Sequence, residues 1–309
     1  SAKDNAWGPA HEIGHIHQLA IDWPSSTESS NNLFSNFILY KLGKYCSRGT
    51  ELNLPKAADN RTTNSEGNIT GMTLSEAHCV LNRPWCNFGS NYQGENTELH
   101  MRMNWQLWNY YHRCGHKTDF WQRLFKLMRE NRTSSNNPGV KQLLFARMAS
   151  EAAQEDLTEF FEMWGFFVTV DTQIDQYGSY QYTVTKEMIE NAKKAMAKYP
   201  KKAKPFYYLE DRKKGDIGLD TTPPDVGHYT QFQRIRPITK DIKGNINGRE
   251  VSITNGDEAV AFELREKDAN GKLLYFSTFI KFEVPLTVSL TYAKLYAVQA
   301  DGKRILLEE

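Results

Sequence analysis

The sequence predicts a mainly α-helical first part followed by a small β-sandwich, and two patterns along the chain indicate this. From Pro9 to about Tyr199, apolar residues recur mostly at the three- and four-residue spacing of helices with one buried face. From about Arg236 onward, apolar and polar residues alternate in short runs, which is typical of strands with one buried face. The second part is long enough for a sandwich of the immunoglobulin-like kind.

The change of pattern also predicts the domain boundaries. A chain of 309 residues is long enough for two domains. We expect a helical domain over residues 1–200 and a β-sandwich over residues 237–309. Residues 201–236 contain three prolines and are expected to form an irregular connector, because proline fixes φ and lacks a backbone donor.

Helix boundaries follow from where the apolar periodicity starts and stops. A first helix begins near Pro9. The stretch between Leu52 and Asn68 is polar and irregular, and we expect it to be a long loop near the candidate site. The other predicted helices span Leu33–Leu42, Asn104–Cys114, Asp119–Glu130, Val140–Ala153, Leu157–Trp164 and Lys186–Tyr199.

Short strands and tight turns are predicted in the last part of the chain. Asn270-Gly271 and Asp301-Gly302 are typical hairpin turns, because asparagine, aspartate and glycine tolerate positive φ. The strands are predicted around Val251–Ile253, Ala259–Leu264, Leu274–Phe276, Phe279–Phe282 and Leu295–Ala297. Their residues indicate no chemistry, so a spacer, a scaffold for the helical domain and a weak glycan-binding module remain alternatives.

The run His11-Glu12-Ile13-Gly14-His15 is the motif that indicates chemistry. Residues four apart on a helix project from one face, so His11 and His15 can bind a single cation. Glu12 lies about 100° further round the helix axis. A catalytic zinc takes three protein ligands and keeps one position open, so the motif requires a third ligand elsewhere in the chain.

Glu28 is the candidate third ligand. It follows Pro24–Thr27, which reads as a turn and helix N-cap, and it begins a helix that runs to about Leu42. Two antiparallel helices joined by this turn would bring Glu28 to face both histidines. The alternative is a chance string in a surface helix, but Gly14 permits close approach of another backbone and Pro9 suits a first helical turn.

Longer runs around the motif resemble one known family. They are Trp7–Gln18, Glu28, Asn31–Ser35, Trp105–Trp108, Phe120–Leu124 and Leu157–Phe166. They resemble the enhancin-like, mucin-targeting gluzincin metallopeptidases, peptidase family M sixty, over at least the first 166 residues. Gluzincins place a small β-sheet before the motif helix, and ten residues precede His11, so the chain resembles the C-terminal portion of such a protein.

The resemblance implies a fold, a cofactor and an activity. The fold would be a gluzincin-type helical bundle without its N-terminal sheet, and the cofactor would be zinc. His11, His15 and Glu28 would be the zinc ligands, and Glu12 would be the general base that takes a proton from the zinc-bound water. The protein would be a secreted endopeptidase of a bacterium, extracellular or at the cell surface, that hydrolyses O-glycosylated, mucin-type proteins.

Two other functions remain open: a zinc peptidase that acts on unglycosylated peptides, and a glycan- or protein-binding fragment without turnover. Trp7 stands where related enzymes present an aromatic ring to a substrate sugar, and its alternative is a core position. The polar stretch Asn60–Thr70 has residue types that suit sugar contacts. The intact Glu12 argues against a loss of catalysis.

Three further side-chain roles are less defined by the sequence. Asn32 lies four residues after Glu28 and can hydrogen-bond a metal ligand, although plain helix-surface polarity is an equal alternative. His17 points away from the histidine pair and is expected at the surface or behind a ligand. Stabilisation of the oxyanion also requires a donor. Tyr92, His78, His100 and His112 are suitable by type, and no spacing selects one.

Composition excludes some classes of function. The 38 basic and 37 acidic residues nearly balance, so nothing indicates a nucleic-acid partner. No apolar run approaches the roughly 18 residues of a membrane span. The four cysteines show no C-x-x-C pair, so a second, structural zinc site is not expected, whereas a Cys79–Cys86 disulfide and free thiols are both open.

Overall fold

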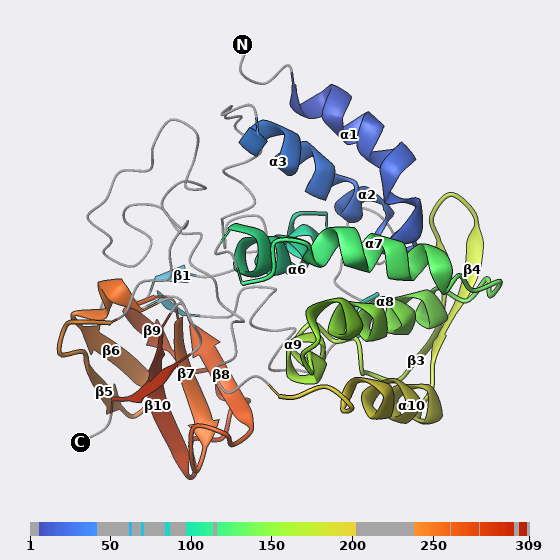
Figure 1. Ribbon diagram of the computed structural model, residues 1–309. Coiled ribbons are helices and arrows are strands. Elements are labelled where there is room, and N and C mark those ends of the chain that lie inside the picture. Colours follow the sequence, from blue (N-terminus) through green and yellow to red (C-terminus); the bar gives the residue numbers. More distant parts are fainter. Residues whose placement is uncertain are drawn as a thin grey trace. The chain divides into compact units, whose positions relative to one another are not determined.

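A computed structural model describes residues 6–41, 62–63, 69–70, 84–86, 97–113, 116–201, 238–259, 261–277, 279–299 and 303–307. The chain divides into two compact units. The first comprises Ser1–Leu52 and Asn82–Ala203, and the second comprises Asn53–Leu81 and Lys204–Glu309. Helices dominate the first unit and small antiparallel sheets the second, as the sequence predicts (Figure 1).

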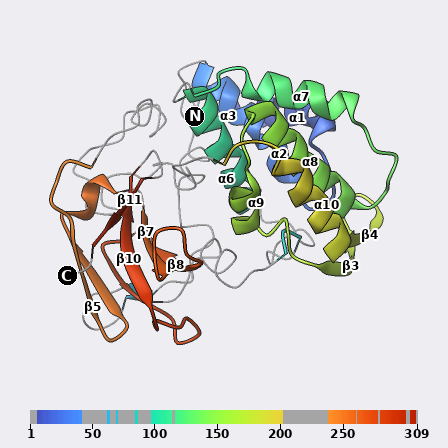
Figure 2. The same ribbon diagram turned by 60° about the horizontal axis from the view of Figure 1, so that its bottom comes forward.

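Helix α8 is central to the first unit and lies between α7 and α10 (Figures 1 and 2). It begins where Asn137 accepts a hydrogen bond from the Gly139 N–H, with Pro138 in the first helical turn, and it ends at Gln154 in a left-handed conformation. The described helices of this unit are α1 (Trp7–His17), α2 (Thr27–Ser30), α3 (Asn32–Lys41), α6 (Thr97–Trp108), α7 (Phe120–Glu130), α8 (Pro138–Ala153), α9 (Thr158–Met163) and α10 (Lys186–Met196). Among the described helices, none is long and apolar enough to cross a membrane.

The predicted helices occur in the predicted order, with two differences. The helix expected to carry Glu28 and to run to about Leu42 is broken at Asn31 into α2 and α3, and Ser26 makes no side-chain cap bond at its start. A tertiary contact accompanies the break, because the backbone of Asn31 packs against α1 at Gly14. Helix α6 starts earlier than predicted and continues into a π-helical turn, Asn109–Arg113.

Aromatic side chains fill the interior of the first unit. The Trp23 ring lies 5.4 Å from Phe145 and 6.3 Å from Phe166, and Trp85 lies 4.9 Å from Phe166. Their burial stabilises the unit by roughly 1.5–3 kcal/mol for each large apolar side chain. Since Trp23 directly precedes the turn that leads to Glu28, this turn starts from a fixed point.

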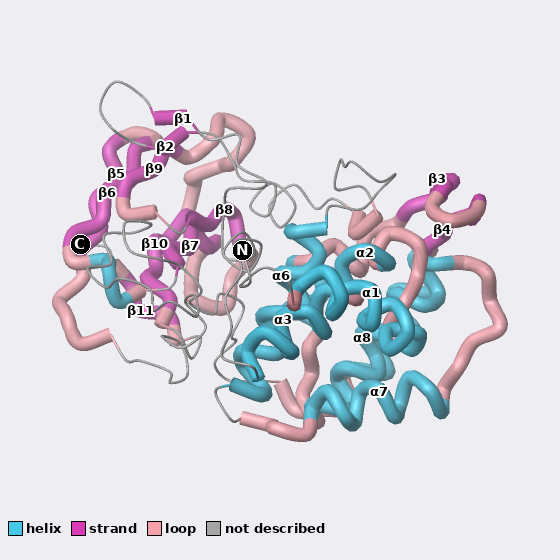
Figure 3. The backbone as a smooth tube through the Cα atoms, turned by 90° about the horizontal axis from the view of Figure 1, so that it is seen from above, coloured by secondary structure: helices cyan, strands magenta, loops and turns pink. Residues whose placement is uncertain are grey.

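The first unit also contains a β-hairpin that the sequence analysis missed. β3 (Val170–Asp175) pairs antiparallel with β4 (Ser179–Val184), in a stretch that we expected to be mostly helical. Alternation of Tyr182 and Val184 with polar residues is a period-2 signal, but a short and weak one. These two side chains are buried, and β4 packs on α8. Figure 3 shows the hairpin beside α2 and α8.

The second unit contains two sheets. The first has the order β1-β2-β9-β6-β5 and includes one parallel contact, Ile69 with Phe282, whereas the second is antiparallel with the order β11-β10-β7-β8. Buried side chains of both sheets form one hydrophobic core. The strands are β1 (Thr62–Thr63), β2 (Ile69–Thr70), β5 (Lys243–Asn247), β6 (Glu250–Thr254), β7 (Ala261–Glu266), β8 (Leu273–Ser277), β9 (Lys281–Glu283), β10 (Ala293–Val298) and β11 (Arg304–Leu306).

Most strand predictions agree with the structure, and the loop prediction needs a correction. The Asn270-Gly271 turn lies between β7 and β8, whereas Asp301-Gly302 and nearly all of the 201–236 connector lie outside the described residues. Of the stretch from Leu52 to Asn68, expected as a loop near the candidate site, only Thr62–Thr63 lies within the described residues, and it forms β1 of the second unit. Pairing with β2, which itself pairs with β9, gives the β-branched Thr62 and Thr63 a place in a sheet.

Candidate metal centre

Side chains from α1 and α2 come together at one point. His11 and His15 lie one turn apart on α1, and Glu28 lies in the short helix α2. The Glu28 Oε2 atom is 3.5 Å from His11 Nε2 and 3.7 Å from His15 Nε2. One ligand atom from each residue lies within 4.8 Å of the other two. A single cation can bridge groups at this spacing.

These three side chains are partly buried and remain accessible. The exposed fraction is 16% for His11, 29% for His15 and 13% for Glu28. Partial burial removes some of the competing water and strengthens charge interactions, while the remaining exposure leaves access for a ligand.

Each histidine has a carboxamide at its other ring nitrogen. Asn32 Oδ1 lies 2.7 Å from His11 Nδ1, and the Asn32 amide donates to the backbone carbonyl of Glu28 at 2.8 Å. The His11 Nδ1–H can therefore donate to Asn32, which leaves the Nε2 lone pair for a cation. Asn32 is buried and contacts His11, which favours a partner of a metal ligand over helix-surface polarity, the two roles that the sequence left open.

Gln18 occupies the corresponding position beside His15. Its amide nitrogen lies 3.1 Å from His15 Nδ1, and its carbonyl oxygen lies 3.1 Å from Ser30 Oγ. A half-turn of this amide presents the oxygen to the His15 Nδ1–H and the nitrogen to Ser30, which is the arrangement that an Nε2 ligand requires. The sequence analysis did not single out Gln18, which is buried.

Asn31 supplies a test of whether a cation fits the site. Its amide nitrogen lies 3.1 Å from His11 Nε2 and 2.9 Å from His15 Nε2, so a donor group touches the two atoms that would bind a metal. Its side-chain oxygen, Oδ1, is buried and has no hydrogen-bond partner among the described residues. A buried acceptor without a partner is unfavourable. The contact of the Asn31 amide with the two imidazoles therefore leaves a polar group of the site unsatisfied.

The donor set also fits zinc. Two imidazole nitrogens and one carboxylate oxygen form a set found in catalytic zinc sites, where a fourth position stays open. Gly14 permits this assembly, because a Cβ at that position would lie 2.5 Å from the backbone carbonyl oxygen of Asn31. The close approach that we expected at Gly14 is thereby confirmed.

The tip of the β3–β4 hairpin reaches the same site. The Tyr177 hydroxyl donates to Glu28 Oε1 at 2.7 Å, and the Gln176 side chain accepts from the Ser25 N–H at 2.7 Å. Separations of 149 and 151 residues explain why the sequence analysis missed both contacts. The Tyr177-Gly178 turn was a signal for a hairpin, and nothing local indicated where the hairpin docks.

The other candidate residues of α1 lie around the cluster. Glu12 is exposed, one position from His11. The Trp7 ring is partly exposed and stacks on the His11 ring, with centroids 4.9 Å apart and planes at 26°. His17 is exposed and lies 5.9 Å from the Phe34 ring, so it is outside the cluster, as expected.

Two of the histidines considered as oxyanion donors have other surroundings. His100 is fully buried, stacks on Trp85 with centroids 3.8 Å apart, and its Nε2 lies 3.1 Å from the Trp85 carbonyl. His112 stacks on Trp108. His78 and Tyr92 lie outside the described residues.

The described cysteine, Cys86, is a free buried thiol, and burial raises its pKa to about 12.

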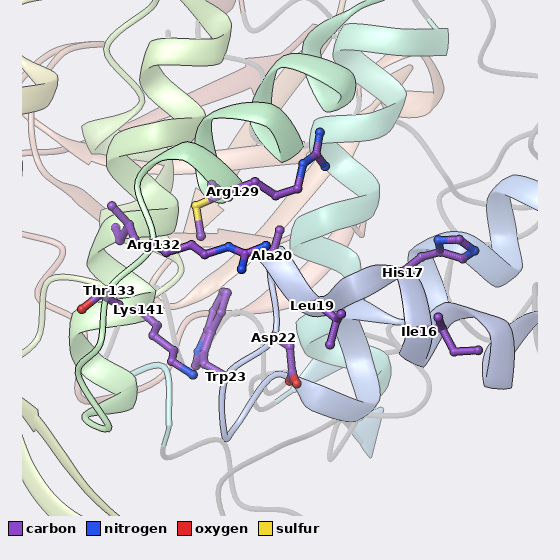
Figure 4. Close-up of a pocket in the computed structure, with 12 residues that line it drawn as sticks. Ile16, His17, Leu19, Ala20, Asp22, Trp23, Arg129, Arg132, Thr133 and Lys141 are labelled. Carbon is purple, nitrogen blue, oxygen red and sulfur yellow. The ribbon is translucent and has the colours of Figure 1, made fainter.

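A cavity of about 490 Å³ lies beside α1, the 3₁₀-helix η1 (Gln18–Ala20) and α7 and is separate from the cluster (Figure 4). Arg129, Arg132 and Lys141 line it together with apolar residues that include Ile16 and Leu19. The Arg132 side chain extends toward Ala20 in this view. The cavity has the size of a small-molecule pocket, but none of the metal-cluster residues His11, His15 and Glu28 lines it.

Comparisons with known proteins give similar proteins for nearly the whole chain. A metallopeptidase solved in complex with Tn antigen is 56% identical, with a TM-score of 0.78 over 99% of this chain and 54% of that one. A metallopeptidase from Bacteroides thetaiotaomicron is 55% identical, with a TM-score of 0.79 over 99% of this chain and 49% of that one. The TRPM8 channel-associated factor homolog of Xenopus laevis is 28% identical over 171 residues, which are 52% of this chain and 15% of that protein.

The chain therefore spans about half the length of the two solved structures and a smaller share of the curated relative. The family model described as peptidase M60, enhancin and enhancin-like, matches residues 1–165, which are more than half of the chain. The model of the peptidase M60 C-terminal domain matches residues 241–306. The chain belongs to the peptidase M60, enhancin and enhancin-like, metallopeptidase family.

Proposed function

We propose that this chain is the metal-binding part of a zinc-dependent endopeptidase that cleaves the backbone of O-glycosylated, mucin-type proteins. The observation that carries the proposal is the convergence of His11, His15 and Glu28 within 4.8 Å, with the exposed carboxylate of Glu12 one residue away on the same helix. Membership of a metallopeptidase family supports the same reaction class.

Different residues of the chain have different roles in the proposed hydrolysis. Zinc, when bound by His11, His15 and Glu28, lowers the pKa of a water molecule from about 15.7 to near 7. Glu12 takes a proton from the attacking water and returns it to the amine that leaves when the peptide bond breaks. Asn32 and Gln18 hold the two imidazole rings in orientation through their Nδ1 atoms.

An O-glycosylated substrate is the class that the comparisons favour. The metallopeptidase that is 56% identical to this chain was solved with Tn antigen. In this chain, Trp7 presents a partly exposed aromatic ring directly beside His11, which suits stacking against a sugar next to the cleaved bond. A peptidase for unglycosylated peptides is the alternative, and it would share every metal-site contact described above.

Two further proposals concern location and the second unit. Mucin-type substrates lie outside cells, so we place the protein outside or on the surface of a bacterial cell. We also propose an immunoglobulin-like β-sandwich for the second unit. The hydrophobic core shared by its two sheets supports this architecture, since facing sheets of a sandwich bury their inner faces together.

The decisive experiment pairs metal binding with hydrolysis. Glu12→Gln should keep zinc and abolish hydrolysis of a glycopeptide by the full-length parent protein, because it removes the base and no ligand. Glu190→Gln, an exposed position on α10, is the matched control and should retain both zinc binding and hydrolysis.

Glycosylated and bare forms of one peptide should then be compared as substrates. Equal hydrolysis of the two forms would overturn the substrate class, and an active Glu12→Gln variant would overturn the mechanism. Zinc binding without hydrolysis by the wild-type parent would indicate a binding protein.

A further inference from the structure

The tip of the β3–β4 hairpin touches the chain at two points, within the turn that leads to Glu28 and at Glu28 itself. Gln176, which is 6% exposed, accepts a hydrogen bond from the buried N–H of Ser25 at 2.7 Å. Ser25 has a φ of 79°, a value that non-glycine residues rarely adopt. The contact therefore satisfies a backbone donor at the most constrained point of the turn.

Tyr177, the next residue, continues this contact to the metal cluster. Its hydroxyl donates to Glu28 Oε1 at 2.7 Å. The other carboxylate oxygen, Oε2, faces His11 Nε2 and His15 Nε2 at 3.5 and 3.7 Å. The two oxygens of Glu28 thus have different partners: one accepts from the phenol and the other points to the cation position.

Burial does not explain a tyrosine at this position. The residue is 77% exposed, so apolar packing contributes little to its placement. Its φ is 53°, where a non-glycine residue outside the favoured asparagine and aspartate costs on the order of 1 kcal/mol. What the side chain supplies to the described site is a hydroxyl within hydrogen-bond distance of a ligand carboxylate.

We propose that Tyr177 is a positioning residue that holds Glu28 as a one-oxygen ligand. An occupied Oε1 keeps the carboxylate from binding the cation through both oxygens, so the fourth coordination position stays open for water or substrate. The hydrogen bond also fixes the carboxylate's rotation before the cation arrives. This inference rests on the proposed metal site and adds the hairpin to it.

The test uses two substitutions that remove the hydroxyl and affect the turn in opposite ways. Tyr177→Phe keeps the ring and the strained backbone, whereas Tyr177→Gly relieves the positive φ. Gln181→Ala, an exposed position of the same hairpin that bonds Asp171, is the control for general damage to the hairpin. Zinc affinity is measured by competition with a chelator, and the cobalt-substituted proteins are compared by visible absorption.

Both Tyr177 variants should bind zinc about 10–100-fold more weakly, the usual effect of losing a hydrogen bond to a metal ligand. Their cobalt spectra should weaken and shift, because two-oxygen binding by Glu28 raises the coordination number, and Gln181→Ala should match the wild type. Wild-type affinity and spectrum in Tyr177→Phe would overturn the inference, as would normal binding by Tyr177→Gly. Lower kcat with unchanged affinity and spectrum would also overturn it, because the hydroxyl would then act on substrate.

Failure of the proposed peptidase function would look different. In that case the parent protein would not hydrolyse glycopeptide or bare peptide, while the loss of zinc affinity in both Tyr177 variants would still hold. If the wild-type chain bound no zinc or cobalt, both proposals would be wrong.

Discussion

Each unit contains a cluster of ionisable side chains, and the two clusters are built in opposite ways. In the first unit, His11, His15 and Glu28 are 13–29% exposed and direct ligand atoms to a common point. In the second unit, the carboxylate of Glu263 is 0% exposed and lies between Arg265 and Arg304, which are 3% and 7% exposed.

The buried cluster satisfies its own charges. Each guanidinium contacts both carboxylate oxygens of Glu263, with Nε atoms 2.5 Å from Oε2. Burial alone raises the pKa of Glu263, but the guanidinium groups of Arg265 and Arg304 outweigh it and hold the pKa below its usual value. In the metal cluster, by contrast, the lone pairs of two imidazoles meet a neutral amide whose oxygen has no described partner. The closed ion network stabilises the fold, whereas the metal cluster keeps convergent electron-pair donors that can bind a ligand.

The largest expected effect comes from removing a ligand of the open cluster. His15→Ala should weaken zinc binding by more than the roughly 10–100-fold that loss of an outer hydrogen bond costs. Thermal unfolding without metal should change little, because the His15 side chain is partly exposed. Titration with a zinc chelator measures the effect. A variant that binds zinc as tightly as the wild type would remove His15 from the site.

Breaking the closed cluster should instead cost stability. Glu263→Gln leaves two buried guanidinium groups without their counter-charge, and loss of one partner of a buried pair costs roughly 3–5 kcal/mol. Denaturant unfolding measures this cost, and zinc affinity should not change. Glu283→Gln, a partly exposed position in β9, is the control and should stay within about 0.5 kcal/mol of the wild type. A stable Glu263→Gln protein would contradict the closed-network interpretation.

A backbone contact rather than a ligand can also be tested in the open cluster. Gly14→Ala places a Cβ 2.5 Å from the Asn31 carbonyl oxygen, so α1 and the α2–α3 junction must move apart. We expect weaker zinc binding, with a smaller change than in His15→Ala, because all three ligands remain. Gly8→Ala on the same helix is the matched control, since a Cβ there meets nothing within 4 Å. Equal zinc affinities for the two variants would show that the close approach is not required.

The smallest effect concerns acid. The pKa of Glu263 in the folded protein is lowered, so its contribution to stability is fully present above the ordinary glutamate pKa of about 4.3 and is lost as pH falls through the lowered value. The stability difference between wild type and Glu263→Gln should therefore shrink below about pH 4. Urea unfolding at several pH values measures this difference. A constant difference would indicate that the pKa of Glu263 is the same in the folded and the unfolded protein.

Much of the fold was predictable because its signals are local. Helical periodicity located most helices, and alternation located five strand runs. The β3–β4 hairpin was missed because two short strands within a helical region carry a weak period-2 signal. The break at Asn31 was missed for another reason: it coincides with the packing of that backbone on Gly14, a contact between distant residues.

The sequence by itself determined the chemistry that α1 can offer. The spacing of His11 and His15 places two imidazoles on one helix face, whatever the rest of the chain does, because helical geometry repeats every 3.6 residues. Only the tertiary structure decided that Glu28 Oε2 lies 3.5 and 3.7 Å from them and that Tyr177 contacts the other oxygen. Such contacts depend on how buried surfaces pack, and a separation of 149 residues carries no local signal of that packing.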